Sequence, residues 1–308
     1  MKRKTDGHGI DQSKKNAAFT ESGVDMNNIG VIGNGFVGSA IVSGFSLHSN
    51  IRIHDADSRK STHSLAEVVN DSEYVFVCVP TPMHSSTGGR IDTSIIESVF
   101  NGVVEQNYDD TIFIIKSTVT PGTIEKLQKK YPALKIIHSP EFLTERAARL
   151  EFINSSRIIL GGQKELTSKV RELFRVRFPH TKIIETDVTT AQFIKYMANC
   201  FFAVKVSFMN EMKQGASAMS VNWNDAMHGF VSDGRIGNSH LDVPGHDGNL
   251  GFGGKCFPKD LNAFIHLFKE SNVSPSVMSA AWHKNLEVRK EHDWQHIIGA
   301  VSKENYNG

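Results

Sequence analysis

The chain has 308 residues, with 34 basic and 33 acidic side chains and a formal net charge of +1. Such a balanced chain lacks the concentrated positive charge of nucleic-acid-binding proteins, so we do not expect nucleic acid as its main ligand. Its apolar runs fall far short of the roughly 20 residues that span a bilayer, so no membrane segment is expected. Three scattered cysteines make no disulfide framework or metal-ligand spacing, which indicates a reducing cytoplasm.

Residues 1–27 are polar and lack the apolar segment of a signal peptide, so we expect a disordered tail or leader there. A short strand at residues 29–32 then leads into a G-x-G-x-x-G sequence that opens a helical pattern. In this context the backbone N–H groups of the turn and the helix N-terminus bind a pyrophosphate, which side chains would keep away. The predicted cofactor contacts are Gly33, Gly35, Phe36, Val37 and Gly38.

A second strand, at residues 51–54, ends at Asp55. This acid follows the glycine motif at about the 20-residue spacing of dinucleotide-binding proteins, where a carboxylate accepts the ribose hydroxyls. A 2′-phosphate beside it would cost about 4 kcal/mol, for unit charges about 4 Å apart at an effective dielectric of about 20. We therefore predict NAD in preference to NADP, although Arg52 and Arg59 lie close enough in sequence to soften the discrimination.

Strand and helix patterns continue to alternate, which predicts an α/β fold: a doubly wound parallel Rossmann sheet over residues 28–188. The further strands are expected at residues 74–79, 112–115, 135–138, 157–160 and 182–185. Ligands bind beyond the carboxyl ends of such strands, which places Thr81 and Thr118 at the cofactor cleft. Glu141 and Glu145 follow the strand at 135–138 and would lie at the same rim, but acids are also common in a solvated first helical turn.

The longest helical pattern begins at an expected capping box of Thr189 and Gln192 and runs to about Gln214. Its apolar surface needs cover from several sides, as in a spine between domains or a dimer contact. Lys195 and Asn199 are four residues apart and share one face of this helix. They could be an ordinary polar flank, or together stabilise an oxyanion.

An all-α region, residues 189–300, is expected to bind substrate and mediate dimerisation, with a tail at 301–308. It contains a glycine-rich loop, residues 251–254, followed by Cys256 between two lysines. The glycines permit positive φ and close approach of a ligand. Neighbouring ammonium groups favour the thiolate, lowering its pKa from about 8.5, so Cys256 is a candidate nucleophile. The alternative is a small, inert buried residue. His240 and His246 stand beside too few other ligands to predict a metal site.

Several motifs occur in a fixed order, and together they cover about residues 28–294. They are the glycine fingerprint, Val79-Pro80-Thr81-Pro82, Lys116-Ser117-Thr118-Val119, Pro140-Glu141-Phe142-Leu143, Lys195-x-x-x-Asn199, Arg235-Ile236-Gly237 and Gly253-Gly254-Lys255-Cys256-Phe257-Pro258-Lys259-Asp260. Their conjunction resembles the nucleotide-sugar 6-dehydrogenase family. Members of that family use NAD to oxidise the C6 alcohol of a nucleotide sugar to a carboxylate in two hydride transfers.

The resemblance implies the oxidation of UDP-glucose to UDP-glucuronate through a thiohemiacetal and a thioester on Cys256. It implies catalytic roles for Cys256, Lys195, Asn199, Asp260, Thr118 and Glu141. It implies further cofactor contacts at Thr81, Thr118, Glu145 and Lys259, and substrate contacts at Glu141, Phe142, Leu143, Glu145, Lys195, Asn199, Arg235, Phe252, Gly253 and Cys256. Because the matching family arginine reaches the substrate of the partner subunit, Arg235 implies a homodimer through helix 189–214.

Two departures from the family pattern keep alternatives open. The family continues into a further nucleotide-gripping domain, whereas this sequence stops at Gly308. Three expectations follow. The chain is a natural short form in which loop 238–250 does more of the nucleotide binding, or another chain supplies the missing half, or the activity is impaired. That loop is also longer and more polar than in many relatives, and Arg146 stands where glycine is common. GDP-mannose and UDP-N-acetyl sugars therefore remain alternative substrates, beside a single-step hydroxyacid dehydrogenase and an NAD-binding dimer module without turnover.

Overall fold

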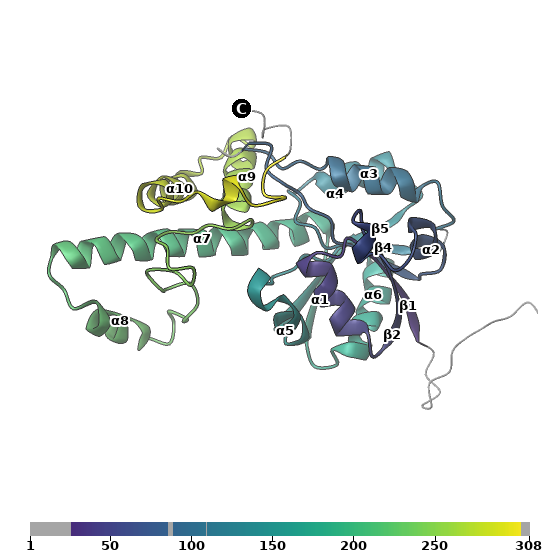
Figure 1. Ribbon diagram of the computed structural model, residues 1–308, viewed down its shortest axis with the longest axis horizontal. Helices are drawn as coiled ribbons and strands as arrows, with labels where there is room; N and C mark the ends of the chain where they lie inside the picture. The colour runs from purple at the N-terminus through teal and green to yellow at the C-terminus, as the bar shows by residue number, and fades with distance from the viewer. Residues whose placement is uncertain (1–25, 86–88, 109, 303–308) are drawn as a thin grey trace, which may run out of the picture.

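The computed structural model describes residues 26–85, 89–108 and 110–302. The predicted tails at 1–27 and 301–308 lie largely outside these residues. A sheet domain and a smaller helical region share one long helix, α7, which runs from the edge of the sheet far beyond it (Figure 1). α9 and α10 cover one side of α7, and α8 lies on the other side near its far end.

Seven strands form one sheet in the order β2-β1-β3-β4-β5-β6-β7. Their bounds are Asn27–Ile32, Ser49–His54, Tyr74–Val77, Ile112–Ile115, Lys135–His138, Arg157–Gly161 and Lys182–Thr186 for β1 to β7. The predicted α/β fold is confirmed, but the sheet is not wholly parallel, because β6 pairs antiparallel to β5 through His138 and Gly161. The two strands meet at their carboxyl ends, since Gly161, the last residue of β6, lies opposite His138, the last residue of β5.

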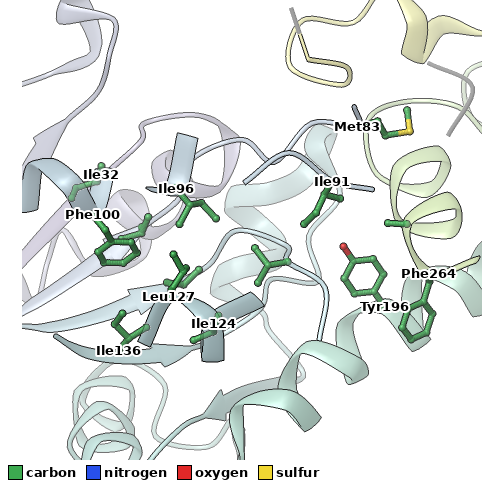
Figure 2. Packing of buried hydrophobic residues seen from close by; sticks show 14 of the residues in the cluster. Ile32, Met83, Ile91, Ile96, Phe100, Ile124, Leu127, Ile136, Tyr196 and Phe264 are labelled. Carbon is green, nitrogen blue, oxygen red and sulfur yellow. The ribbon is translucent and has the colours of Figure 1, made fainter. Parts of the chain in front are cut away.

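Helices cover both faces of the sheet. Those before α7 are α1 Phe36–Phe45, α2 Leu65–Asn70, α3 Ser94–Val103, α4 Thr123–Lys130, α5 Ala148–Ile153 and α6 Lys164–Arg177. One apolar cluster gathers phenylalanines from α1, α5 and α6, with Phe45 at its centre. The other lies under α2, α3 and α4 and continues to Tyr196 of α7 and Phe264 of α9, whose rings stack 5.1 Å apart (Figure 2). This second core joins the helical region to the sheet.

The long helix α7 spans Val188–Ala218 and begins differently from the prediction. Asp187, not Thr189, is the N-cap, and its carboxylate accepts the backbone N–H of Thr190 at 2.8 Å. The expected capping box is therefore wrong, because Gln192 instead points into the sheet domain and accepts the N–H of Gly122 at 2.9 Å. A charged acceptor was available two residues earlier, at the place where an anion best complements the helix dipole.

The remaining helices are α8 Trp223–Val231, α9 Phe257–Glu270 and α10 Ser276–Val288. α10 ends at Val288, and the chain then turns back toward the sheet domain. Met83 donates to the carbonyl of Ala300, and the N–H of Ser302 donates to the carbonyl of Met83, both at 2.8 Å. Val301 and Ser302, assigned to a tail from the sequence, are thus buried and hydrogen-bonded.

Candidate active site

The glycine fingerprint forms the turn between β1 and α1. Gly33 has φ of +92°, a conformation that L side chains rarely adopt, and a Cβ on Gly38 would lie 2.0 Å from the carbonyl oxygen of Gly33. Gly33 and Gly38 are therefore required by the packing of strand against helix. A Cβ on Gly35 would meet nothing within 4 Å. The packing does not require this glycine, and the open space at Gly35 fits a backbone that a pyrophosphate approaches closely.

Asp55 closes the same turn from the end of β2. One carboxylate oxygen accepts the N–H of Asn34, inside the glycine turn, at 2.6 Å, and the other accepts the N–H of Asp57 at 2.8 Å. The acid expected to bind the ribose is thereby held beside the predicted pyrophosphate turn. Phe36 and Val37 pack partly against the adjoining apolar cluster. These residues would hold the adenosine half of NAD.

Thr81 and Thr118 leave the ends of β3 and β4, and the structure brings them together as expected. The Thr81 hydroxyl donates to the carbonyl of Thr118 at 2.7 Å, and Thr81 is buried. The adjacent Ser117 hydroxyl donates to the carbonyl of Val79 at 2.7 Å. These bonds fix two neighbouring loops at the carboxyl edge of the sheet.

Lys195 of α7 points at Glu141, which follows β5. The ammonium nitrogen Nζ lies 3.0 Å from Glu141 Oε1, while Oε2 accepts the N–H of Leu143 at 2.6 Å. Glu141 is buried, so the reading of it as a solvated helix start is wrong. Burial disfavours the charged amine of Lys195, but the carboxylates of Glu141 and Asp260 outweigh it and raise the pKa of Lys195. Lys195 is thus a fixed cation at neutral pH.

Two cations lie near the ring of Phe142, which follows Glu141. The guanidinium of Arg157 stacks on its ring at 4.2 Å, and the ammonium of Lys195 lies 5.4 Å from the same ring. Behind this loop is a cavity of about 410 Å³, lined by Lys116, Pro140, Glu141, Phe142, Arg157 and Phe174 among others. Lys116 donates to Ser139 Oγ and to the carbonyl of Pro140, so it holds the backbone that presents Glu141.

Asp260, in the first turn of α9, is the second buried carboxylate of the site. It accepts the amide of Asn199 at 2.6 Å and the ammonium of Lys259 at 2.5 Å. Lys195 and Asn199 therefore do not form an ordinary polar flank, because each meets a buried carboxylate. Lys259, predicted to contact the cofactor, directs its ammonium to its neighbour Asp260 and is itself buried.

Cys256 immediately precedes α9 and is partly exposed. Burial raises the pKa of its thiol to about 11, and the carboxylates of Glu141 and Asp260 add to this shift against the opposing charges of Lys195 and Lys259. The expected lowering of its pKa is therefore wrong. Lys255 is drawn instead toward Glu145, at 3.8 Å. Cys256 nevertheless shares one electrostatic environment with the predicted catalytic side chains Lys195, Glu141 and Asp260.

Other predicted substrate contacts are placed differently. Arg235 is exposed and paired with Asp233 of its own loop at 2.5 Å. Phe252 is buried, and its ring packs against Trp282, 6.2 Å between centroids. Glu145 starts a short 3-10 helix, Glu145–Ala147, with its side chain 61% exposed. These three residues do not join the buried cluster around Lys195.

Sequence reasoning missed four polar residues that bond to the glycine-rich loop or pack against it. They are Asn210, Asn285, Arg289 and Asp293. The last three are spaced four residues apart, and this regular spacing of polar residues was the available signal. Two glycines of the loop accommodate this cluster rather than a ligand: a Cβ on Gly251 would lie 2.3 Å from Asn285, and one on Gly253 would lie 2.2 Å from Arg289.

Within the described residues, no three His, Cys, Asp or Glu side chains gather in a way that could hold a metal ion. In that same part of the chain, none of the helices has the length and apolar character needed to cross a bilayer.

The glycine turn between β1 and α1, Asp55 at the end of β2 and the strand order together define a Rossmann-type dinucleotide-binding protein with an attached helical domain. Residues 47–177 match the NAD binding domain of the UDP-glucose/GDP-mannose dehydrogenase family, and residues 189–287 match its central domain. The chain belongs to this family and contains its NAD-binding domain. The glycine fingerprint itself precedes the matched residues.

Individual relatives agree with the family. The UDP-glucose 6-dehydrogenase of Rickettsia conorii is 30% identical over 76% of this chain and 53% of that protein. The UDP-glucose 6-dehydrogenase of Pseudomonas aeruginosa is 32% identical over 77% of this chain and 53% of that protein. A solved UDP-glucose dehydrogenase from Pyrobaculum islandicum has the same fold, with a TM-score of 0.74 at 24% identity, over 87% of this chain and 70% of that chain. The chain spans about half the length of the curated relatives it matches.

Proposed function

We propose that this chain carries the NAD-dependent oxidation of a nucleotide sugar at C6, from alcohol to carboxylate, with Cys256 as the covalent nucleophile. The observation that carries the proposal is one partly exposed thiol in the electrostatic environment of a buried ammonium, Lys195, and two buried carboxylates, Glu141 and Asp260. A dehydrogenase that stops at the aldehyde or ketone needs no thiol there. A four-electron oxidation does, because the aldehyde must be converted into a species that can lose a second hydride.

NAD, when bound, accepts the hydride in each of the two oxidations. After the first, the sulfur of Cys256 bonds to the C6 carbonyl carbon, and the thiol proton ends on O6 as a thiohemiacetal. Because the thiol is protonated at neutral pH, its proton must move during the attack, and Glu141 and Asp260 are the carboxylates that act on it most strongly. The positive charge of Lys195 and the amide of Asn199 stabilise negative charge as it develops on O6.

The second oxidation removes a hydride from C6 and the proton from O6, which leaves a thioester on Cys256. Water then adds to the thioester carbon, the carbon–sulfur bond breaks, and the sulfur regains a proton. Asp260, with Thr118 and Glu141, is proposed to position or activate this water. One alcohol, two NAD and one water thus give one carboxylate, two NADH and three protons.

UDP-glucose is the proposed substrate and UDP-glucuronate the product. The support is that two relatives 30% and 32% identical to this chain are named UDP-glucose 6-dehydrogenases. GDP-mannose and UDP-N-acetyl sugars are the alternatives, since the matched family includes GDP-mannose dehydrogenases. Comparing kcat/KM for these nucleotide sugars separates them. The free state of Cys78, Cys200 and Cys256 fits a cytoplasmic location, which we also propose.

We further propose a homodimer through α7. Along one side of this helix lie large exposed apolar side chains, at Phe193, Met197, Phe201, Phe208 and Met212. Phe201 is 62% exposed, and a contiguous apolar stripe of this kind usually marks an interface. Arg235, exposed and absent from the buried cluster of its own chain, would then serve the substrate of the partner subunit.

The deciding experiment counts NADH released per UDP-glucose consumed under single-turnover conditions, with the product identified, in the wild type and in Cys256→Ser. Two NADH per sugar with a glucuronate product, and loss of the complete reaction in Cys256→Ser, are expected. One NADH per sugar in both proteins would instead favour a single-step dehydrogenase. NAD binding without any NADH formation from these nucleotide sugars would contradict the proposed activity for this chain alone.

A further inference from the structure

The glycine-rich loop that presents Cys256 is gripped from behind by buried polar side chains. The N–H of Gly251 donates to Asn210 at 3.1 Å, and the N–H of Phe252 donates to Asn285 Oδ1 at 2.6 Å. The amide of Asn285 donates back to the carbonyl of Phe252 at 3.0 Å. Asn210 and Asn285 are 2% and 0% exposed. Buried amides commit these bonds to one loop conformation, since a shifted loop would leave them unpaired.

The next two glycines meet a charged pair. The N–H of Gly254, two residues before Cys256, donates to Asp293 Oδ2 at 3.0 Å. Arg289, 2% exposed at its side chain, pairs with Asp293 at 3.2 Å and with Asp247 at 2.8 Å. A Cβ on Gly253 would lie 2.2 Å from the Arg289 guanidinium and 2.3 Å from Asp293 Oδ1. Only glycine lets the pair reach the loop backbone.

The segment that carries Asp293 is itself tied down. Trp294 is 1% exposed and packs on Trp282, 5.5 Å between centroids. Farther along, the Ser302 hydroxyl donates to Asp92 Oδ2 at 2.7 Å, on the sheet domain. Asn210, Asn285, Arg289 and Asp293, which hold the cysteine loop, are called the clamp below. Through the segment that follows Asp293, the clamp is connected to the sheet domain.

We propose that Asn285 and Asp293 are positioning residues for Cys256. They fix the backbone of loop 251–254, and this loop sets the position of the partly exposed thiol at the start of α9. The expected effect on catalysis rests on the proposed function, whereas the hold of these residues on the loop does not. Loosening the clamp exposes the thiol, and the part of its raised pKa that burial causes is lost. Cys256 then becomes more reactive toward reagents while it becomes a worse catalyst, because its position is lost.

The test uses Asp293→Ala in the full chain, with Asp247→Ala as matched control. Both substitutions remove one carboxylate from Arg289, but only Asp293 bonds the cysteine loop. The readout is the rate of carbamidomethylation of each cysteine at pH 8 by peptide mass spectrometry, without nucleotide. A fall of one unit in the pKa raises the thiolate fraction about tenfold, so Cys256 should react about tenfold faster in Asp293→Ala and within about twofold of wild type in Asp247→Ala.

Cys78 and Cys200 serve as internal controls, since general unfolding would make them reactive as well. Should Asp293→Ala fail to fold, Gly253→Ala tests the same contact from the loop side, by placing a Cβ against Arg289. Equal alkylation rates of Cys256 in the Asp293 and Asp247 variants would overturn the proposal. Where nucleotide-sugar turnover is measurable, kcat should fall about tenfold or more in Asp293→Ala with the KM for NAD little changed. If the wild type turns over no nucleotide sugar, the alkylation result still decides the clamp.

Discussion

Lys195 and Glu141 form a buried ion pair, 3.0 Å between nitrogen and oxygen, with side chains only 3% and 6% exposed. Removing one partner leaves an uncompensated buried charge, which typically costs about 3 to 5 kcal/mol. We therefore expect Glu141→Ala to lower the free energy of unfolding by about 3 kcal/mol in urea titrations. The exposed pair of Lys130 and Glu97 is the control, since Glu97→Ala should cost under about 1 kcal/mol. Equal effects of the two substitutions would refute the buried pair.

The pH dependence of Cys256 follows from its environment. Burial and the carboxylates of Glu141 and Asp260 raise its pKa to about 11, so its thiolate fraction grows about tenfold per pH unit until that value. We expect alkylation of Cys256 by iodoacetamide to accelerate throughout pH 7 to about 10 without levelling off. An accessible cysteine would level off earlier, near its ordinary pKa of about 8.5. An alkylation rate that levels off below about pH 9 would show that the lysines lower the pKa of Cys256 more than burial and the carboxylates raise it.

Substitutions of Gly35 and Gly38 test cofactor binding and folding stability separately. A Cβ on Gly38 collides with the backbone of Gly33, and such overpacking costs about 1 to 3 kcal/mol, so Gly38→Ala should lower Tm. A Cβ on Gly35 enters open space, so Gly35→Ala should leave Tm unchanged but weaken NAD binding about tenfold, or about 1.4 kcal/mol. Calorimetric titration with NAD measures the second effect. Unchanged affinity in Gly35→Ala would place the pyrophosphate elsewhere.

Asp55 should govern the choice between NAD and NADP. Its carboxylate is fixed in place by the N–H groups of Asn34 and Asp57. Asp55→Asn keeps an acceptor oxygen but removes the charge that repels a 2′-phosphate, so the preference for NAD should fall about tenfold or more. Binding of both cofactors to wild type and variant, measured at the same ionic strength, gives the ratio. A wild type that prefers NADP would show that the positive charges of Arg52 and Arg59 outweigh the repulsion between Asp55 and the 2′-phosphate.

The apolar stripe on α7 predicts the oligomeric state. Phe201→Glu places a charge in the proposed interface, where an unpaired buried charge is costly, and should convert the dimer to monomer. Leu47→Glu, which alters an apolar residue on the sheet domain that is even more exposed, at 86%, should leave it a dimer. Light scattering coupled to size-exclusion chromatography distinguishes the two. A monomeric wild type at micromolar concentration would refute the interface.

Local patterns in the chain were enough to predict the strands, the glycine turn, the long helix and the order of the functional motifs. These features depend on the periodicity of apolar residues and on the backbone freedom of glycine, which neighbouring residues determine. The N-cap of α7 was placed two residues too late, at Thr189 instead of Asp187. The two possible caps stand close together, and Gln192, which the capping box needed, bonds instead to Gly122 of the sheet domain.

By itself, the sequence determined the fold class and the catalytic candidates: a Rossmann domain, a helix carrying Lys195 and Asn199, and a cysteine after a glycine-rich loop. Only the tertiary structure decided which charges meet, since Lys195 finds Glu141 across 54 residues and Asn199 finds Asp260 across 61. It also reversed the expected pKa shift of Cys256. The physical reason is that burial and two carboxylates distant in sequence act through space on the thiol and outweigh the opposing charges of Lys195 and Lys259.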